Sequence, residues 1–79
     1  MIKQMKYFQA VVRYQNFTKA AEECFISQSA ISQQIQALEK ELGVQLIQRE
    51  KRKITLTEAG EYFYRKSLVI VSDFDRLCA

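Results

Sequence analysis

Apolar residues recur at helical spacing along most of this chain, which predicts a mainly α-helical fold. The first stripe, Met5, Phe8 and Val12 with Val11 on its flank, indicates an amphipathic helix over residues 2–14. The sequence has no proline and only two glycines, so few residues interrupt a helix.

A short second helix is expected to begin at Thr18, whose hydroxyl is a candidate N-cap for the alanine-rich stretch that follows. The inner face of this helix consists of small residues, Ala20, Ala21 and Cys24. Small side chains let a neighbouring helix approach closely, as the packing of a tight helix-turn-helix unit requires.

A third helix is predicted from about residue 28 to residue 42. Ser27 is its candidate N-cap, with Ile26 and Ile31 in the arrangement of a hydrophobic staple. Gly43 ends the helix, because glycine adopts positive φ without strain. The apolar stripe of the helix is Ile31, Ile35, Leu38 and Leu42.

The opposite face of the third helix is rich in amides and hydroxyls. Its first two turns contain no acidic residue, although Asp and Glu are favoured near helix N-termini. Such a surface suits an approach to phosphates and base edges, while an ordinary solvated face is the alternative. The residues on or near this face are Gln28, Ser29, Ser32, Gln33, Gln36 and Lys40.

Two short β-prone runs follow the third helix. Residues 44–47 and 53–56 flank a stretch, residues 48–53, in which four of six residues are basic. The pattern predicts a hairpin with a basic loop. A charge run is often only solvated, but beside an amide-rich helix face it favours contact with phosphates or a minor groove. The basic residues are Arg49, Lys51, Arg52 and Lys53.

A long final helix is predicted from residue 58 to about residue 77, with Thr57 as its N-cap. Its second half carries more apolar surface than one small domain covers. Either a partner helix packs on this surface, or the helix folds back onto its own core. The stripe is Ala59, Phe63, Ile70, Phe74 and Leu77, broadened by Tyr62, Val69 and Val71.

Composition narrows the possible functions. The 79 residues suffice for one small domain, and the net charge of +3 is compatible with nucleic acid without demonstrating it. There is no histidine, no Gly-rich phosphate loop and no metal-ligand spacing, so we expect neither an enzyme nor a bound metal or cofactor. With no signal peptide and no membrane span, a cytoplasmic protein is expected. Cys24 and Cys78 are expected to be reduced thiols, with a disulfide as the alternative.

Several short runs occur in order and without gaps: Met5-Lys6-Tyr7-Phe8, Asn16-Phe17-Thr18-Lys19-Ala20-Ala21, Ile26-Ser27-Gln28-Ser29-Ala30-Ile31-Ser32, Ile35, Leu38-Glu39, Glu41-Leu42-Gly43-Val44, Leu46, Arg49 and Leu56-Thr57-Glu58-Ala59-Gly60. This succession, over residues 2 to about 65, resembles the N-terminal DNA-binding domain of LysR-type transcriptional regulators. One helix-turn-helix spacing alone would be weak evidence, whereas the whole succession is specific.

The resemblance implies a winged helix-turn-helix over residues 1–57, with a three-helix core and a two-stranded β wing, followed by a linker and dimerisation helix over residues 58–79. The third helix would enter the major groove of double-stranded DNA, and the wing, residues 49–53, would reach the flanking backbone or minor groove. The last helix would pair with its twofold mate to form a homodimer, through Phe63, Ile70, Phe74 and Leu77. The family's effector-binding domain, through which a small-molecule inducer acts, is expected to be absent from this chain, which looks like an isolated fragment or a truncated member.

Position by position, the resemblance assigns DNA contacts to the start of the third helix and to the wing. Gln28, Ser29 and Ala30 match residues that approach bases. Ser32 and Gln33 match positions that contact phosphate or bases. The predicted set of DNA contacts is completed by Thr18, which lies near the backbone, and by Ser27, Gln36, Arg49, Lys53 and the wing-tip residue Arg52.

The chain departs from the family's pattern at four places. Gln33 stands where arginine is frequent, which weakens or redirects that contact. Ser29 replaces a frequent proline, and Cys24 replaces the usual leucine. The wing tip lacks its usual glycine, which leaves the turn type open.

Two other interpretations stay open at this point. The chain is a protein-interaction module if its last helix only pairs with a partner and the other helices only support it. Alternatively it binds DNA as a natural competitor that heterodimerises with longer relatives. The acid-free helix face and the basic wing argue against a pure scaffold, since a scaffold requires neither.

Overall fold

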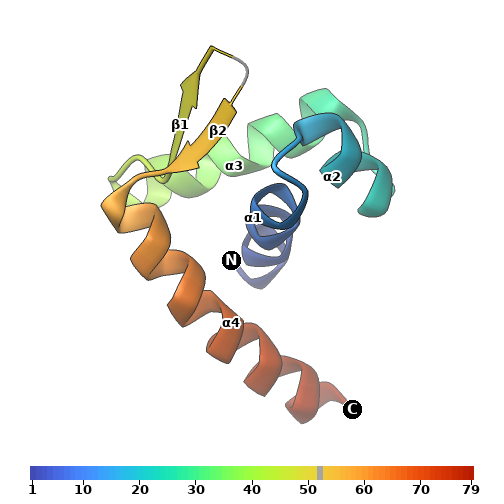
Figure 1. Cartoon of the computed structure of the whole chain (residues 1–79). Helices are drawn as coiled ribbons and strands as arrows, with labels where there is room; N and C mark the ends of the chain where they lie inside the picture. Colours follow the sequence, from blue (N-terminus) through green and yellow to red (C-terminus); the bar gives the residue numbers. More distant parts are fainter. Residues whose placement is uncertain (52) are drawn as a thin grey trace.

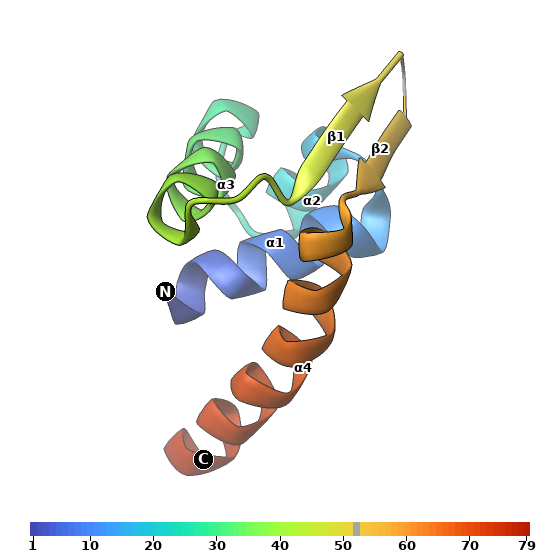
Figure 2. The same cartoon turned by 90° about the vertical axis from the view of Figure 1, so that its left-hand side faces the viewer.

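The mainly helical architecture predicted from the sequence is confirmed by a computed structural model, which describes residues 1–51 and 53–79. Within them the chain forms α1 (Ile2–Tyr14), α2 (Phe17–Glu23), α3 (Gln28–Leu42), β1 (Ile47–Glu50), β2 (Lys53–Leu56) and α4 (Glu58–Cys78). The hairpin projects from one end of the three-helix core, and α4 leads away from the hairpin toward the C-terminus (Figures 1 and 2). These elements make a three-helix core, a two-stranded wing and a long final helix.

The core lies where α1, α2 and α3 meet beneath the hairpin. Phe8, Ile31, Leu38 and Leu46 are fully buried in it. Val11, on the flank of the predicted stripe, is also fully buried, whereas Val12 is only half-buried. α1 contacts α2, α3 and α4, and a helix covered on several sides buries a broader face than one stripe.

Side-chain caps fix where the helices begin. Ser27 Oγ accepts a hydrogen bond from the Ala30 amide, and Thr57 Oγ1 accepts one from the Gly60 amide, which confirms both predicted N-caps. The predicted cap at Thr18 was wrong, because Asn16 Oδ1 accepts from the Lys19 amide and the N-cap thus lies two residues earlier. Asparagine ranks among the strongest N-capping residues, and Asn16 has the extended backbone of a cap.

The hairpin is antiparallel and pairs Ile47 with Leu56 and Glu50 with Lys53. The first strand begins at Ile47, three residues later than predicted. The Leu46 and Ile47 amides donate instead to Glu39 Oε2, over 2.7 and 3.1 Å, so this part of the chain is tied to α3 before the ladder begins. At the turn Lys51 adopts a φ of 53°, the left-handed conformation that the missing glycine would supply.

α4 packs along α1 through one face. Phe63 and Tyr64 meet the Phe8 ring edge-on, with Phe63 centred 5.6 Å from it. Further along the helix, Ser67 is fully buried and accepts a hydrogen bond from Gln9 Nε2 over 3.1 Å. Val71, predicted to broaden the apolar stripe, is also buried, so at this position the helix packs on its own chain. The first half of α4 therefore belongs to the core, and its packing sets the direction of the second half.

Candidate nucleic-acid interface

The outer face of α3 is a continuous polar surface. Ser29, Gln33 and Gln36 are exposed, while the apolar stripe on the other side of the helix is buried as far as Leu38. The first acidic residue of α3 is Glu39, so three turns pass without a negative charge. A helix with this surface meets a polyanion without like-charge repulsion, and its amides and hydroxyls offer donors and acceptors to it.

Four polar side chains form two hydrogen-bonded pairs at the N-terminal end of α3. Ser27 and Ser29 hydroxyls lie 3.2 Å apart, beside the capping bond at Ala30. Thr18, which does not cap α2, donates from Oγ1 to Gln28 Oε1 over 3.0 Å. The side chain of Thr18 thus joins α2 to the first residue of α3 and orients the Gln28 amide.

The wing contributes cations to the same side of the molecule. Arg49 lies on β1 and is exposed, and its Nη2 donates to Ser32 Oγ on α3 over 3.1 Å. The Arg49 guanidinium also lies over the Phe17 ring, with Cζ 4.2 Å from the ring centroid. Lys53 is exposed on β2, and the predicted wing-tip residue Arg52 lies outside the described residues. The structure therefore brings the wing, α2 and α3 together at Arg49.

Sequence reasoning predicted Arg49 and Ser32 separately and did not single out Phe17. The contact between Arg49 and Phe17 joins residues 32 positions apart, so no local pattern indicates it. A usable signal was present at Asn16, since an N-cap there makes Phe17 the first residue of α2 and turns it toward the core. The remaining predicted residue, Ala30, is half-buried at the base of this surface.

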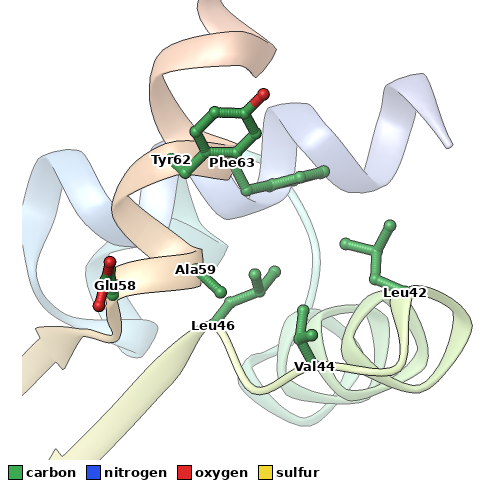
Figure 3. A pocket seen from close by; sticks show the side chains of 7 residues that line it. All are labelled: Leu42, Val44, Leu46, Glu58, Ala59, Tyr62 and Phe63. Atoms are coloured by element: carbon green, nitrogen blue, oxygen red, sulfur yellow. The ribbon is translucent and has the colours of Figure 1, made fainter.

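Several apolar side chains of α4 are exposed. On α4, Ile70 and Phe74 are exposed to 44% and 40%, and Leu77 to 82%. An apolar groove lies where the start of α4 passes the end of α3, with Leu42 and Val44 on one wall and Tyr62 and Phe63 on the other (Figure 3). Among the described residues no helix has the length and apolarity needed to cross a membrane.

Both cysteines are free thiols. Cys24 is half-buried at the end of α2, and burial raises the pKa of its thiol, an effect that the nearby Arg13 charge partly opposes. Cys78 is exposed near the end of α4.

Three packed helices followed by an antiparallel hairpin define a winged helix-turn-helix domain, with α2 and α3 as the helix-turn-helix and β1–β2 as the wing. Residues 2–61 match the bacterial regulatory helix-turn-helix proteins of the lysR family, and the chain belongs to this family. It is thus a LysR-type helix-turn-helix DNA-binding domain.

Known relatives agree with this assignment. The HTH-type transcriptional regulator BenM of Acinetobacter baylyi is 42% identical over 76 residues, which are 96% of this chain and 25% of BenM. The crystal structure of the BenM DNA-binding domain with catB site 1 DNA is 41% identical, with a TM-score of 0.94 over 99% of this chain and 84% of that chain. The crystal structure of a CbnR DNA-binding domain–DNA complex is also 41% identical, with a TM-score of 0.91 over 96% of this chain and 87% of that chain. The chain spans about a quarter of the length of BenM, and these relatives are transcriptional regulators rather than enzymes.

Proposed function

We propose that this chain binds double-stranded DNA with sequence preference, with α3 in the major groove and the β1–β2 wing on the flanking backbone or minor groove. The observation that carries the proposal is the acid-free, exposed polar face of α3 beside the cations of the wing. A helix about 10–12 Å across matches a major groove about 12 Å wide. Two similar domains have been solved in complex with DNA, which supports DNA as the ligand.

Within this proposal the contacts divide into two kinds. Gln28, Ser29 and Ala30 at the start of α3 approach base edges, with Gln33 and Gln36 further along the groove. The remaining residues contact the backbone and supply affinity that depends on salt. They are Thr18, Ser27, Ser32, Arg49, Arg52 and Lys53. Since the bacterial chromosome lies in the cytoplasm, the chain acts there, as a binding module and not as an enzyme.

The exposed face of α4 supports pairing with a second copy of the chain. Six exposed positions along one face are spaced by 4, 3, 1, 3 and 4 residues, a sequence of intervals that is the same from either end. An antiparallel twofold pair of helices needs this symmetry about its axis. The positions are Tyr62, Lys66, Val69, Ile70, Asp73 and Leu77, with Phe74 and Phe63 beside them.

In this arrangement the twofold axis passes between Val69 and Ile70. Lys66 then faces Asp73 of the second copy, so opposite charges meet on both sides of the axis. Leu77 faces Tyr62 of the second copy, at the rim of the groove in Figure 3, where its exposed side chain finds an apolar surface. Residues 1–57 thus carry the DNA contacts, and residues 58–79 join two copies that read two half-sites.

The test is fluorescence anisotropy on a random-sequence duplex at several salt concentrations, with the mass of the free protein measured by light scattering. We expect micromolar or tighter binding by a dimer, and a steep loss of affinity with salt. Arg52→Ala is expected to lower affinity for all sequences alike and to flatten the salt slope by about one. A folded dimer that fails to bind at low salt would contradict the proposal and favour the interaction module.

A further inference from the structure

The guanidinium of Arg49 is held in place from two sides. The Phe17 ring lies beneath it, with Cζ 4.2 Å from the centroid, and Ser32 Oγ accepts a hydrogen bond from Nη2 over 3.1 Å. These two partners come from different elements, α2 and α3, while Arg49 itself comes from β1. Phe17 is only 8% exposed, so its ring is fixed by the core, whereas Arg49 remains open to solvent.

The positive charge of Arg49 has no acid to neutralise it in the part of the chain that the structure describes, where the ion pairs are Lys6–Asp75 and Asp73–Arg76. Glu39 lines one surface depression together with Phe17 and Arg49, but its Oε2 accepts from two backbone amides. A guanidinium carries five N–H donors, and Ser32 takes one of them. An oriented cation with donors to spare is suited to a phosphate, which accepts paired hydrogen bonds from this group.

We infer that Phe17 is a positioning residue for Arg49, and that Phe17, Ser32 and Arg49 form a preformed site for one DNA backbone phosphate where α3 meets the wing. The inference rests on the proposed DNA-binding function and adds a residue to it that touches no DNA. Arginine has a long, flexible side chain, and ordering it on binding costs entropy. A guanidinium already stacked on a fixed ring loses less of that freedom when the phosphate arrives.

The competing explanation is that Arg49 only braces the wing against α3. The two explanations differ in what they predict for binding. A phosphate contact contributes about 0.9 to the slope of log affinity against log salt, whereas a brace contributes nothing to it. If the Phe17 ring acts through Arg49, replacing Phe17 no longer changes DNA affinity once the guanidinium is removed. If the ring serves only the core, replacing it has the same effect with or without Arg49.

The experiment is a double-mutant cycle, measured as anisotropy on a random-sequence duplex across a salt series. Arg49→Ala is expected to lower affinity and to reduce the salt slope by about 0.9. Phe17→Leu is expected to lower affinity about two- to fivefold, the range for an exposed cation–π contact. The same Phe17→Leu change is expected to have no effect when Arg49→Ala is already present. Phe17→Tyr, which keeps the aromatic face, is expected to bind like the unaltered chain.

Phe8→Leu is the matched control, because it removes another buried ring from the same core, away from Arg49, and should leave the affinity of the folded protein unchanged. Equal losses from Phe17→Leu with and without Arg49, or an unchanged salt slope in Arg49→Ala, overturn the inference while DNA binding stands. A chain that binds no duplex at low salt overturns the proposed function, and the inference with it. If Phe17→Leu fails to fold, Arg49→Lys keeps the charge without the planar stack. A two- to fivefold loss at an unchanged salt slope then supports the site, and unchanged affinity overturns it.

Discussion

Thr18 controls the orientation of the Gln28 amide, because its Oγ1 donates to Gln28 Oε1 over 3.0 Å. A glutamine that pairs with adenine uses its carbonyl oxygen and its NH2 group together. With the oxygen held by Thr18, Gln28 presents its two N–H donors, and these suit the acceptors O6 and N7 of guanine. The hydroxyl of Thr18 therefore biases the base that Gln28 prefers.

We predict that Thr18→Val shifts the preference at one base position from guanine toward adenine. The shift is expected to be about 1 kcal/mol, roughly fivefold, at the lower end of the discrimination that one side chain provides. The measurement is competition among four duplexes that differ at that position, found beforehand by selection from a random pool. Thr18→Ser keeps the hydroxyl and serves as control. If Val and Ser variants share one base preference, the Thr18–Gln28 contact has no part in specificity.

A second prediction concerns Gly60, in the first turn of α4. A Cβ added there would lie 2.0 Å from the carbonyl oxygen of Leu46, a backbone atom that already accepts from the Thr57 amide. Gly60→Ala must therefore push α4 away from the start of the wing, at a cost of about 1–3 kcal/mol. For a domain of this size we expect the melting temperature to fall by roughly 5–20 °C.

Gly43 provides the comparison for this experiment. It ends α3 at a φ of 73°, and no atom of the described residues lies within 4 Å of the position of its Cβ. Gly43→Asn should be nearly neutral, because asparagine tolerates the left-handed conformation. A larger loss at Gly43 than at Gly60 would show that backbone conformation, and not close approach, limits these positions.

The two glycines illustrate what a sequence alone can and cannot predict here. Gly43 follows an apolar stripe at the point where a helix must end, so local spacing indicates its role. The role of Gly60 depends on the carbonyl of Leu46, which approaches only in the folded chain. The same distinction separates the correctly predicted caps at Ser27 and Thr57 from the pairs Gln9–Ser67 and Arg49–Phe17, which join distant segments.

The bond between Gln9 and Ser67 is a buried polar contact between α1 and α4. Ser67 Oγ accepts from Gln9 Nε2 over 3.1 Å and donates to the Tyr64 carbonyl over 2.8 Å. Ser67→Ala leaves the buried Gln9 amide without this partner, and we expect a loss of about 1–3 kcal/mol in the free energy of unfolding. Gln9→Met combined with Ser67→Ala should recover most of that loss, because both groups are then apolar. Urea denaturation measures the free energy of unfolding of both variants. If the double variant loses the sum of what the two single changes cost, Gln9 and Ser67 do not stabilise the fold through this contact.

The two thiols should differ in reactivity. Burial raises the pKa of the Cys24 thiol, so little of the reactive thiolate forms near neutral pH, whereas Cys78 is exposed. Iodoacetamide at pH 8 is expected to label Cys78 first and Cys24 slowly, and the rate at Cys24 should rise at higher pH. In urea both should react at similar rates. Mass spectrometry of the peptides decides the order, and faster labelling of Cys24 in the folded chain would refute it.

The proposed pairing of α4 is tested most directly by its charges. In the antiparallel arrangement Lys66 faces Asp73 of the second copy at two symmetric places, so a single reversal, Lys66→Glu or Asp73→Lys, places like charges together twice. Exposed ion pairs contribute about 0.2–1 kcal/mol each, so losing both symmetric pairs should weaken the dimer roughly 2- to 30-fold, and the like charges that then meet weaken it further. The combined variant Lys66→Glu with Asp73→Lys restores opposite charges and should dimerise like the unaltered chain. Sedimentation equilibrium measures the dissociation constant of each dimer. Leu77→Glu removes the apolar contact at the groove, so this variant should stay monomeric whatever the charges at 66 and 73. A double reversal as weak as either single one would reject this register, even if the chain still dimerises through another surface.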